Sequence, residues 1–339
     1  MKKFFFAYTL LLIFGSPVLS KSIDYDPDLW LPDTVHLALG NTIELYNDNI
    51  AFIRLNDTLI SFKWEHEKGM SDNKKFYWTA DQIGIVKLTI KCFYINELID
   101  SAKTVLKVVD KKNAGIKNLL AIGNSLTGGG FNYQFQQISD DLSCKLNPIG
   151  TQGTKYKHEG HGGWAFSTFL SDKSPFFIQN TINFKKYIQD NNLPNPDIIR
   201  ISLGINDCFG KTNMDNIMSA ASRLIDTINH DYPNSLIIIA LPTLCENTGE
   251  GWIANYHNLE NLEPYQLRIR ELWKRLSAKY SYGRYKPDIQ ISYDGLVIDR
   301  ENGYPKNNGV HPNETGYRQL VRGFSNTLNY YLINSKNQF

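Results

Sequence analysis

The chain has 339 residues, of which 42% are hydrophobic and 21% are charged, so it can bury a sizeable core and is long enough for two domains. Its formal net charge is +2 at pH 7, and the sequence contains no basic run. This balance disfavours nucleic acid and acidic membrane surfaces as partners, and we expect a neutral or small substrate.

The first 20 residues have the layout of a secretory signal peptide. Lys2 and Lys3 precede the apolar stretch FFFAYTLLLIFG, which Pro17 and the small-residue segment SPVLSK follow. The apolar stretch is short for a membrane span, so we expect a cleaved signal peptide (1–20) rather than an uncleaved anchor. The mature chain is then periplasmic or extracellular, with no membrane contact. No cysteine lies at the expected cleavage point, which argues against a lipoprotein.

Residues 23–112 show the alternation of half-buried β-strands. The segment VKLTIKC (86–92) places Val86, Leu88, Ile90 and Cys92 on one face, and NTIELY and TVLKVV alternate similarly. We predict antiparallel strands in a small all-β sandwich, an accessory domain that ends at the linker DKKNAG. Its aromatic side chains either stack on sugars or fill the core, and filling is the commoner role; they include Trp64, Tyr77 and Trp78.

Residues 113–335 alternate strands with helices. The apolar runs IKNLLAIG, PDIIRISLG and NSLIIIALP predict buried strands, and helical spacing follows in FNYQFQQISDDL, in 217–228, in EPYQLRIRELWKRL and in ETGYRQLVRGFSNTL. Strands that are apolar throughout require helices on both faces. The prediction is a flavodoxin-like, doubly wound parallel sheet, an α/β/α sandwich. Ligands bind such sheets at the carboxyl ends of the strands.

Four polar stretches fall at strand ends or in nearby loops: GNSLT at 123, HEGHGGW at 158, GIND at 204 and NNGVHPNETGY at 307. In this order they resemble the four blocks of the SGNH, or GDSL, hydrolase superfamily, over roughly residues 117–320. The resemblance does not include the predicted sandwich. It implies a serine esterase that needs no cofactor.

The resemblance also assigns roles to individual residues. It makes Ser125 the nucleophile and His311 the base that takes its proton. The oxyanion donors are then the backbone N–H groups of Ser125 and Gly163 and the side-chain amide of Asn206. Each residue has a structural alternative: a turn serine at Ser125, a helix cap at Asn206. GNSLT lacks the second glycine of G-x-S-x-G, and Asn124 replaces the aspartate usual in the family.

The HEGH segment resembles a metal site without matching one. His158 and His161 are three residues apart, which differs from H-E-x-x-H, and no third ligand is evident, so we expect no metal. Glu159 and His161 instead shape the wall of the substrate pocket, with Trp164 as its apolar floor and Asn124 beside the nucleophile. The glycines at 128–130 lack the Lys-Ser/Thr of a phosphate-binding loop.

Asn308 departs from the family, in which an aspartate commonly lies three residues before the catalytic histidine. In a serine protease, the exchange of aspartate for asparagine cost about ten-thousandfold in rate. Either Ser125 and His311 act as a dyad, with Asn308 or a backbone carbonyl orienting the ring, or Asp294, Asp299 or Glu301 reaches the site, or activity is lost. We favour the dyad.

The four cysteines, Cys92, Cys144, Cys208 and Cys245, show no C-x-x-C spacing, so structural zinc is not expected. Export permits disulfides. Cys208 and Cys245 should lie at one rim of the sheet, either bridged or as two free thiols.

We interpret the chain as an exported carboxylic ester hydrolase, with acetyl esters on polysaccharide as the favoured substrate by family analogy. Lipid or thioester substrates are alternatives. The alternative from another class is a carbohydrate-binding or adhesion protein with a degenerate hydrolase domain, which Asn124 and Asn308 motivate.

Overall fold

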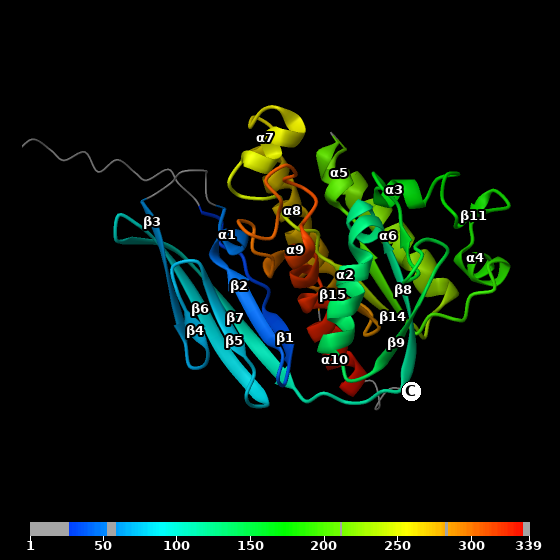
Figure 1. Cartoon of the computed structure of the whole chain (residues 1–339), viewed down its shortest axis with the longest axis horizontal. Helices are drawn as coiled ribbons and strands as arrows, with labels where there is room; N and C mark the ends of the chain where they lie inside the picture. Colours follow the sequence, from blue (N-terminus) through cyan, green and yellow to red (C-terminus); the bar gives the residue numbers. More distant parts are fainter. Residues whose placement is uncertain (1–26, 53–58, 211, 282–283, 335–339) are drawn as a thin grey trace, which may run out of the picture.

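The computed structural model describes residues 27–52, 59–210, 212–281 and 284–334. A strand-rich N-terminal part, here called the β region (27–52 and 59–109), lies beside a larger α/β region that begins with the strand at 116 (Figure 1). The predicted signal peptide lies outside the described residues. Within the described ranges, no helix is both long and apolar enough to cross a membrane.

The β region contains two sheets. The four-stranded sheet has the order β1-β7-β6-β3, and the three-stranded sheet has the order β2-β5-β4. The strands are β1 (Thr34–Ala38), β2 (Thr42–Tyr46), β3 (Ile60–His66), β4 (Met70–Ser71), β5 (Lys75–Thr79), β6 (Gly84–Tyr94) and β7 (Glu97–Val109). All pairs are antiparallel except β1 with β7, which is parallel. The expectation of antiparallel strands throughout was therefore wrong for β1, because alternation shows which side chains are buried and not the direction of the neighbouring strand.

The two sheets of the β region face each other across an aromatic core. In β6 the residues predicted to point inward are buried. Trp64 on β3 and Trp78 on β5 are each 6% exposed, and the Trp64 ring lies 5.6 Å from that of Phe76 across the sheets. Tyr77 is half-buried. The two tryptophans thus fill the core, as the commoner role predicted.

The α/β region is built on a fully parallel sheet. Its strands are β8 (Ile116–Gly123), β9 (Lys145–Ile149), β10 (Glu159–Gly160), β13 (Ile198–Ser202), β14 (Leu236–Ala240) and β15 (Ile289–Ser292). β9 and β10 both pair with the same edge of β8, followed by β13, β14 and β15 on its other side. This order confirms the doubly wound, flavodoxin-like prediction. A small hairpin of β11 (Phe177–Ile178) and β12 (Thr181–Ile182) lies outside the sheet.

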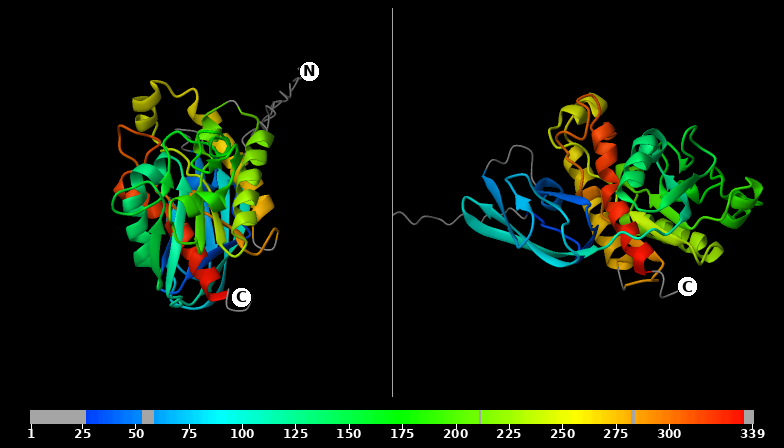
Figure 2. Two further views of the ribbon diagram at one scale, coloured as in Figure 1. Left: turned by 90° about the vertical axis from the view of Figure 1, so that its right-hand side faces the viewer. Right: turned by 60° about the horizontal axis from the view of Figure 1, so that its bottom comes forward.

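Helices cover both faces of the parallel sheet (Figures 1 and 2). Leu119 and Ala121 of β8 pack with α2 (Ser125–Asp141) and α10 (Arg322–Asn334). Leu120 and Ile122 share the other cluster with α6 (Met214–Asp231) and α8 (Leu262–Tyr280). Shorter elements complete this region: α3 (Phe166–Phe169), α4 (Phe184–Asp190), α5 (Ile205–Phe209), α7 (Glu250–Tyr256), α9 (Glu314–Leu320) and the 3₁₀ turn η1 (Asp294–Leu296).

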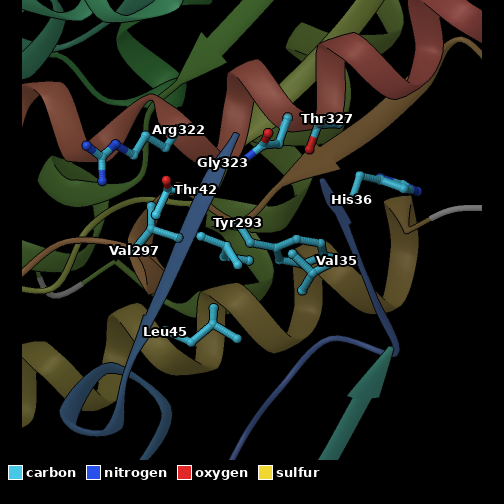
Figure 3. Close-up of a pocket in the computed structure, with 11 residues that line it drawn as sticks. Val35, His36, Thr42, Leu45, Tyr293, Val297, Arg322, Gly323 and Thr327 are labelled. Carbon is cyan, nitrogen blue, oxygen red and sulfur yellow. The ribbon is translucent and has the colours of Figure 1, made fainter. Parts of the chain in front are cut away.

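The β region packs directly on α10. Asn326 of α10 accepts hydrogen bonds from the backbone of Ala38 (3.3 Å) and from the side chain of Asn41 (2.8 Å), and Tyr330 stacks on His36 at 3.9 Å. A cavity of about 10 Å³ remains at this contact, between the two blue strands β1 and β2 and the red helix α10 (Figure 3). That volume is at the lower limit for one water molecule, so the contact is closely packed.

Candidate active site

Ser125 lies where β8 ends and α2 begins. Asn124 is the N-cap of α2, and its side-chain oxygen accepts the backbone N–H of Leu126 at 2.9 Å. Asn124 is 2% exposed, so it caps the helix from inside rather than lining a surface. As the first residue of α2, Ser125 keeps a backbone N–H that the helix cannot bond.

The glycines that follow Ser125 allow α2 to pack closely on its neighbours. A side chain at Gly130 would place its first carbon 2.2 Å from the ring of Tyr317 on α9. Gly128 lies against Gly160 of β10, where a first side-chain carbon would come within 2.4 Å of the Gly128 nitrogen. Gly128 and Gly130 therefore allow close packing around the serine.

Ser125 and His311 are hydrogen-bonded, although 186 positions separate them in the chain. The Ser125 Oγ lies 2.9 Å from Nε2 of His311, which is in the loop before α9. Both side chains are half-buried and reach solvent. Burial lowers the pKa of His311 below its ordinary value, which keeps the imidazole neutral at physiological pH.

Asn308 fixes which nitrogen of His311 carries the proton. Its Oδ1 accepts the backbone N–H groups of Val310 (3.0 Å) and His311 (2.9 Å) and lies 3.3 Å from Nδ1 of the ring. Because two backbone N–H groups donate to this atom, it must be the amide oxygen of Asn308 and not the amide nitrogen. Nδ1 must then carry the proton, and Nε2 presents a lone pair to the Ser125 hydroxyl. This is the tautomer that a general base requires.

The other carboxylates considered for this role bond elsewhere. Asp299 accepts the backbone N–H groups of Glu301 and Asn302, Asp294 is buried against Arg200 at 2.8 Å, and Glu301 pairs with Lys74 of the β region. In the described part of the chain, no carboxylate hydrogen-bonds to His311.

The predicted oxyanion donor Asn206 is hydrogen-bonded to the segment that contains the other predicted donor, Gly163. Asn206 Nδ2 donates to the carbonyl of Trp164, the residue after Gly163, at 2.9 Å. A primary amide has two N–H groups, so the second can serve a substrate. The N-cap of α5 is Gly204, which excludes the capping alternative for Asn206. Gly163 has φ of +78°, with open space where a side chain would begin, so its conformation rather than crowding favours glycine.

Asp207 is a site residue that the sequence reasoning missed. Both oxygens of its buried carboxylate accept the backbone N–H of Phe166, at 3.1 and 3.3 Å. Burial raises its pKa to about 6. Asn206 and Asp207 thus hold successive parts of the 163–166 segment, and the GIND block was the signal that could have pointed to this pairing.

Glu159 and His161 form a second polar pair beside this segment. Glu159 is fully buried and accepts hydrogen bonds from His161 (3.0 Å), Tyr187 and Thr151. Burial alone would raise the pKa of Glu159, but these hydrogen bonds outweigh it, and the pKa is lowered. The His161 ring stacks on that of Trp164 at 4.1 Å, and both rings are partly exposed. His161 and Trp164 therefore offer surface to a substrate, whereas Glu159 orients His161.

Neither a metal cluster nor a disulfide is present in the described residues. No group of three or more His, Cys, Asp or Glu side chains there could hold a metal ion. Cys92, Cys144, Cys208 and Cys245 are all buried free thiols, so Cys208 and Cys245 are not bridged.

Comparison with known proteins adds the family. Three similar solved structures are a carbohydrate esterase family 3 protein from Talaromyces cellulolyticus (16% identity, 64% of this chain, 99% of that chain, TM-score 0.42), the Clostridium thermocellum family 3 carbohydrate esterase (18%, 65%, 98%, 0.44) and a putative GDSL-like lipase from Parabacteroides merdae (15%, 66%, 98%, 0.41). No curated protein matches the chain. Residues 119–324, more than half of the sequence, match the profile of the GDSL-like lipase/acylhydrolases. The chain belongs to the GDSL-like lipase/acylhydrolase family.

Proposed function

We propose that the chain is an exported serine esterase that removes acetyl groups from carbohydrate. The observation that carries the catalytic part is the Ser125–His311 hydrogen bond of 2.9 Å together with the Asn308 contact that sets the ring tautomer. A degenerate site would have no reason to keep this alignment.

Acyl transfer follows from the geometry. His311 Nε2 takes the hydroxyl proton as Ser125 Oγ attacks the ester carbonyl. Negative charge develops on the carbonyl oxygen, which the N–H groups of Ser125, Gly163 and Asn206 stabilise. The protonated His311 then gives its proton to the leaving alcohol, and an acyl-serine remains.

Deacylation repeats these steps with water. His311 takes a proton from a water molecule, which attacks the acyl-serine carbonyl. The same donors stabilise the oxyanion. Ser125 leaves with the proton returned by His311, and the free acid is released. Asn308 has no charge to stabilise the imidazolium, so we expect a slower enzyme than one with aspartate at this position.

Aromatic groups near the site support a carbohydrate substrate. Phe209 follows Asn206 by three residues on α5, so the two side chains share a face. Phe209 and Tyr256 are 38% and 40% exposed, with ring centroids 5.5 Å apart. Rings of this kind can stack on the C–H face of a sugar. The acetyl group is proposed by analogy with the family.

Hydrolysis of activated esters tests this proposal. The mature chain should hydrolyse 4-nitrophenyl acetate faster than the butyrate and octanoate esters, and should release acetate from acetylated oligosaccharides. Ser125→Ala should abolish both activities. Ser139→Ala, on the same helix but bonded to the Phe135 carbonyl, should retain them. A preference for octanoate would favour lipid substrates, and the absence of hydrolysis with retained glycan binding would favour the binding protein. Amino-terminal sequencing of exported protein tests cleavage of residues 1–20.

A further inference from the structure

The β region contacts the loop that carries His311 through a buried arginine. We propose that Arg300 is a positioning residue, through which the β region sets the geometry of the Ser125–His311 pair. This inference rests on the proposed function for its kinetic consequences. It makes the β region part of the catalytic machinery rather than a separate accessory module.

The contact point in the β region is α1 (Asn47–Ile50), a short helix after β2. Arg300 donates from Nη1 to the Asp48 carbonyl at 2.9 Å. Arg270 of α8 donates to the next two carbonyls, those of Asn49 at 2.7 Å and Ile50 at 2.8 Å. The last carbonyls of a helix lack partners within it, so α1 offers acceptors to both guanidinium groups. Arg300 and Arg270 are 4% and 2% exposed.

Arg300 also reaches toward the catalytic loop. Its Nε donates to the Cys245 carbonyl at 2.6 Å, and its Nη2 lies 3.5 Å from the Glu246 carbonyl. The backbone N–H of Glu246 in turn donates to the carbonyl of Gly309, next to Asn308, at 2.9 Å. A continuous path of hydrogen bonds therefore connects α1 with Gly309, the residue next to Asn308, which orients His311.

Two further side chains reinforce the connection. Asn247 donates from Nδ2 to the Asp48 carboxylate at 2.6 Å, which joins the 245–247 segment to α1 a second time. Asn49 is fully buried, and its Nδ2 donates to the carbonyls of Leu296 (3.1 Å) and Ile298 (2.8 Å). The chain that leads into Arg300 is thus fixed on α1 as well.

The catalytic loop has little freedom at the end of this path. A first side-chain carbon at Gly309 would lie 2.6 Å from the backbone nitrogen of Trp252 and 2.9 Å from Cγ of Glu246. His311 is held by a neutral amide, without a charge to draw the imidazole into place. Its position therefore depends on the loop backbone. A displacement of about 1 Å at a catalytic group can cost about a hundredfold in rate.

Arg270 provides a matched control. Its side chain is similarly buried and bonds to the same helix. Its guanidinium donates to the backbone carbonyls of Asp28, Asn49 and Ile50, which all belong to the β region. Arg270→Lys weakens the attachment of the β region and leaves the 245–247 segment untouched. Arg300→Lys weakens both. Asn247→Ala removes the second link at a less buried position.

The experiment compares these variants below the unfolding temperature of each. We expect Arg300→Lys to lower kcat for 4-nitrophenyl acetate about tenfold or more with KM within twofold, and Asn247→Ala to lower it severalfold. Arg270→Lys should keep kcat within twofold although its Tm falls. In an NMR titration, which does not depend on turnover, the pKa of His311 should rise toward its ordinary value in Arg300→Lys, because a looser loop admits water. His311→Gln identifies the signal.

Equal losses of kcat in Arg300→Lys and Arg270→Lys would overturn the proposal, as would a His311 pKa that does not change in Arg300→Lys. If Arg300→Lys does not fold, an unchanged kcat and His311 pKa in Asn247→Ala would overturn it instead. Failure of the proposed function is distinguishable, because the wild type would then not differ from Ser125→Ala, while the NMR titration still decides the positioning role.

Discussion

Asn308→Asp introduces the carboxylate that the family usually has. The carboxylate can accept the same three N–H groups that Asn308 Oδ1 meets now, at 3.0, 2.9 and 3.3 Å, so the loop should keep its shape. The variant adds a negative charge and replaces the amide NH2 group by an oxygen. We expect a higher pKa for His311 and a higher kcat.

The magnitude follows from the 3.3 Å separation of Oδ1 and Nδ1. Coulomb attraction between a carboxylate and an imidazolium at that distance is about 5 kcal/mol at an effective dielectric of about 20. His311 is half-buried, so solvent screens the pair, and about 1.5–3 kcal/mol is the usual net gain of a hydrogen bond to a charged group. This free energy would raise the pKa of His311 by about one to two units. If the whole of it stabilises the transition state, kcat rises by about 10- to 100-fold.

The assay is kcat/KM for 4-nitrophenyl acetate as a function of pH. His311 acts as a base when it is neutral, and burial lowers its pKa in the wild type, so activity should be lost only as the pH falls through that lowered value. The new carboxylate raises the pKa, so the acid limb should move to higher pH and the gain should appear above it. Asn307→Asp, which adds the same charge at the exposed neighbouring position, should have a much smaller effect. Unchanged kcat and an unshifted acid limb in Asn308→Asp would refute the assignment of Asn308 as the partner of His311.

Three further predictions test other parts of the site. Asn206→Ala should lower kcat about a hundredfold with little change in KM, because it removes an oxyanion donor; a loss confined to KM would contradict that role. Gly129→Ala should stabilise the protein by up to about 1 kcal/mol in urea unfolding, because a helical glycine is replaced where the nearest atom is 3.8 Å away. Gly130→Ala should destabilise it through the clash with Tyr317, and equal effects of the two changes would argue against this packing. The four cysteines should all react with a thiol reagent in denaturant without reductant, and slowly in the native protein, where burial raises the pKa of Cys208 to about 12; fewer than four would indicate a disulfide.

Much of the fold was predictable because apolar runs mark buried strands. β8, β13 and β14 occur where IKNLLAIG, PDIIRISLG and NSLIIIALP predicted them. α2 begins at Ser125 rather than near Phe131, since the close contacts that require small residues at Gly128 and Gly130 involve β10 and α9, far away in sequence. The predicted single helix at 314–328 is two helices that meet at Val321. Short elements such as β10 and α7 lack enough residues for a periodic signal.

The candidate site was also predictable only in part. Ser125, Asn206 and His311 were predicted from their blocks, and the fold brings Ser125 and His311 together at the carboxyl end of the sheet. The direction in which a side chain points was not predictable: Glu159 is buried and Asp299 bonds within its own loop. The orientation of the Asn308 amide depends on two backbone N–H groups, which no residue pattern reveals. The division into domains at 23–112 and 113–335 stays a prediction.

The contact between α10 and β1 affects the order in which the protein can complete its fold. Strand β1 is synthesised almost 300 residues before α10, yet Asn326 supplies the acceptor for Ala38 and Tyr330 covers His36. During synthesis, this face of the β region therefore stays uncovered until α10 has been made. A chain that stops before residue 322 would leave that face of β1 uncovered and remove a layer from the parallel sheet, so we expect cellular proteases to recognise such fragments from both regions.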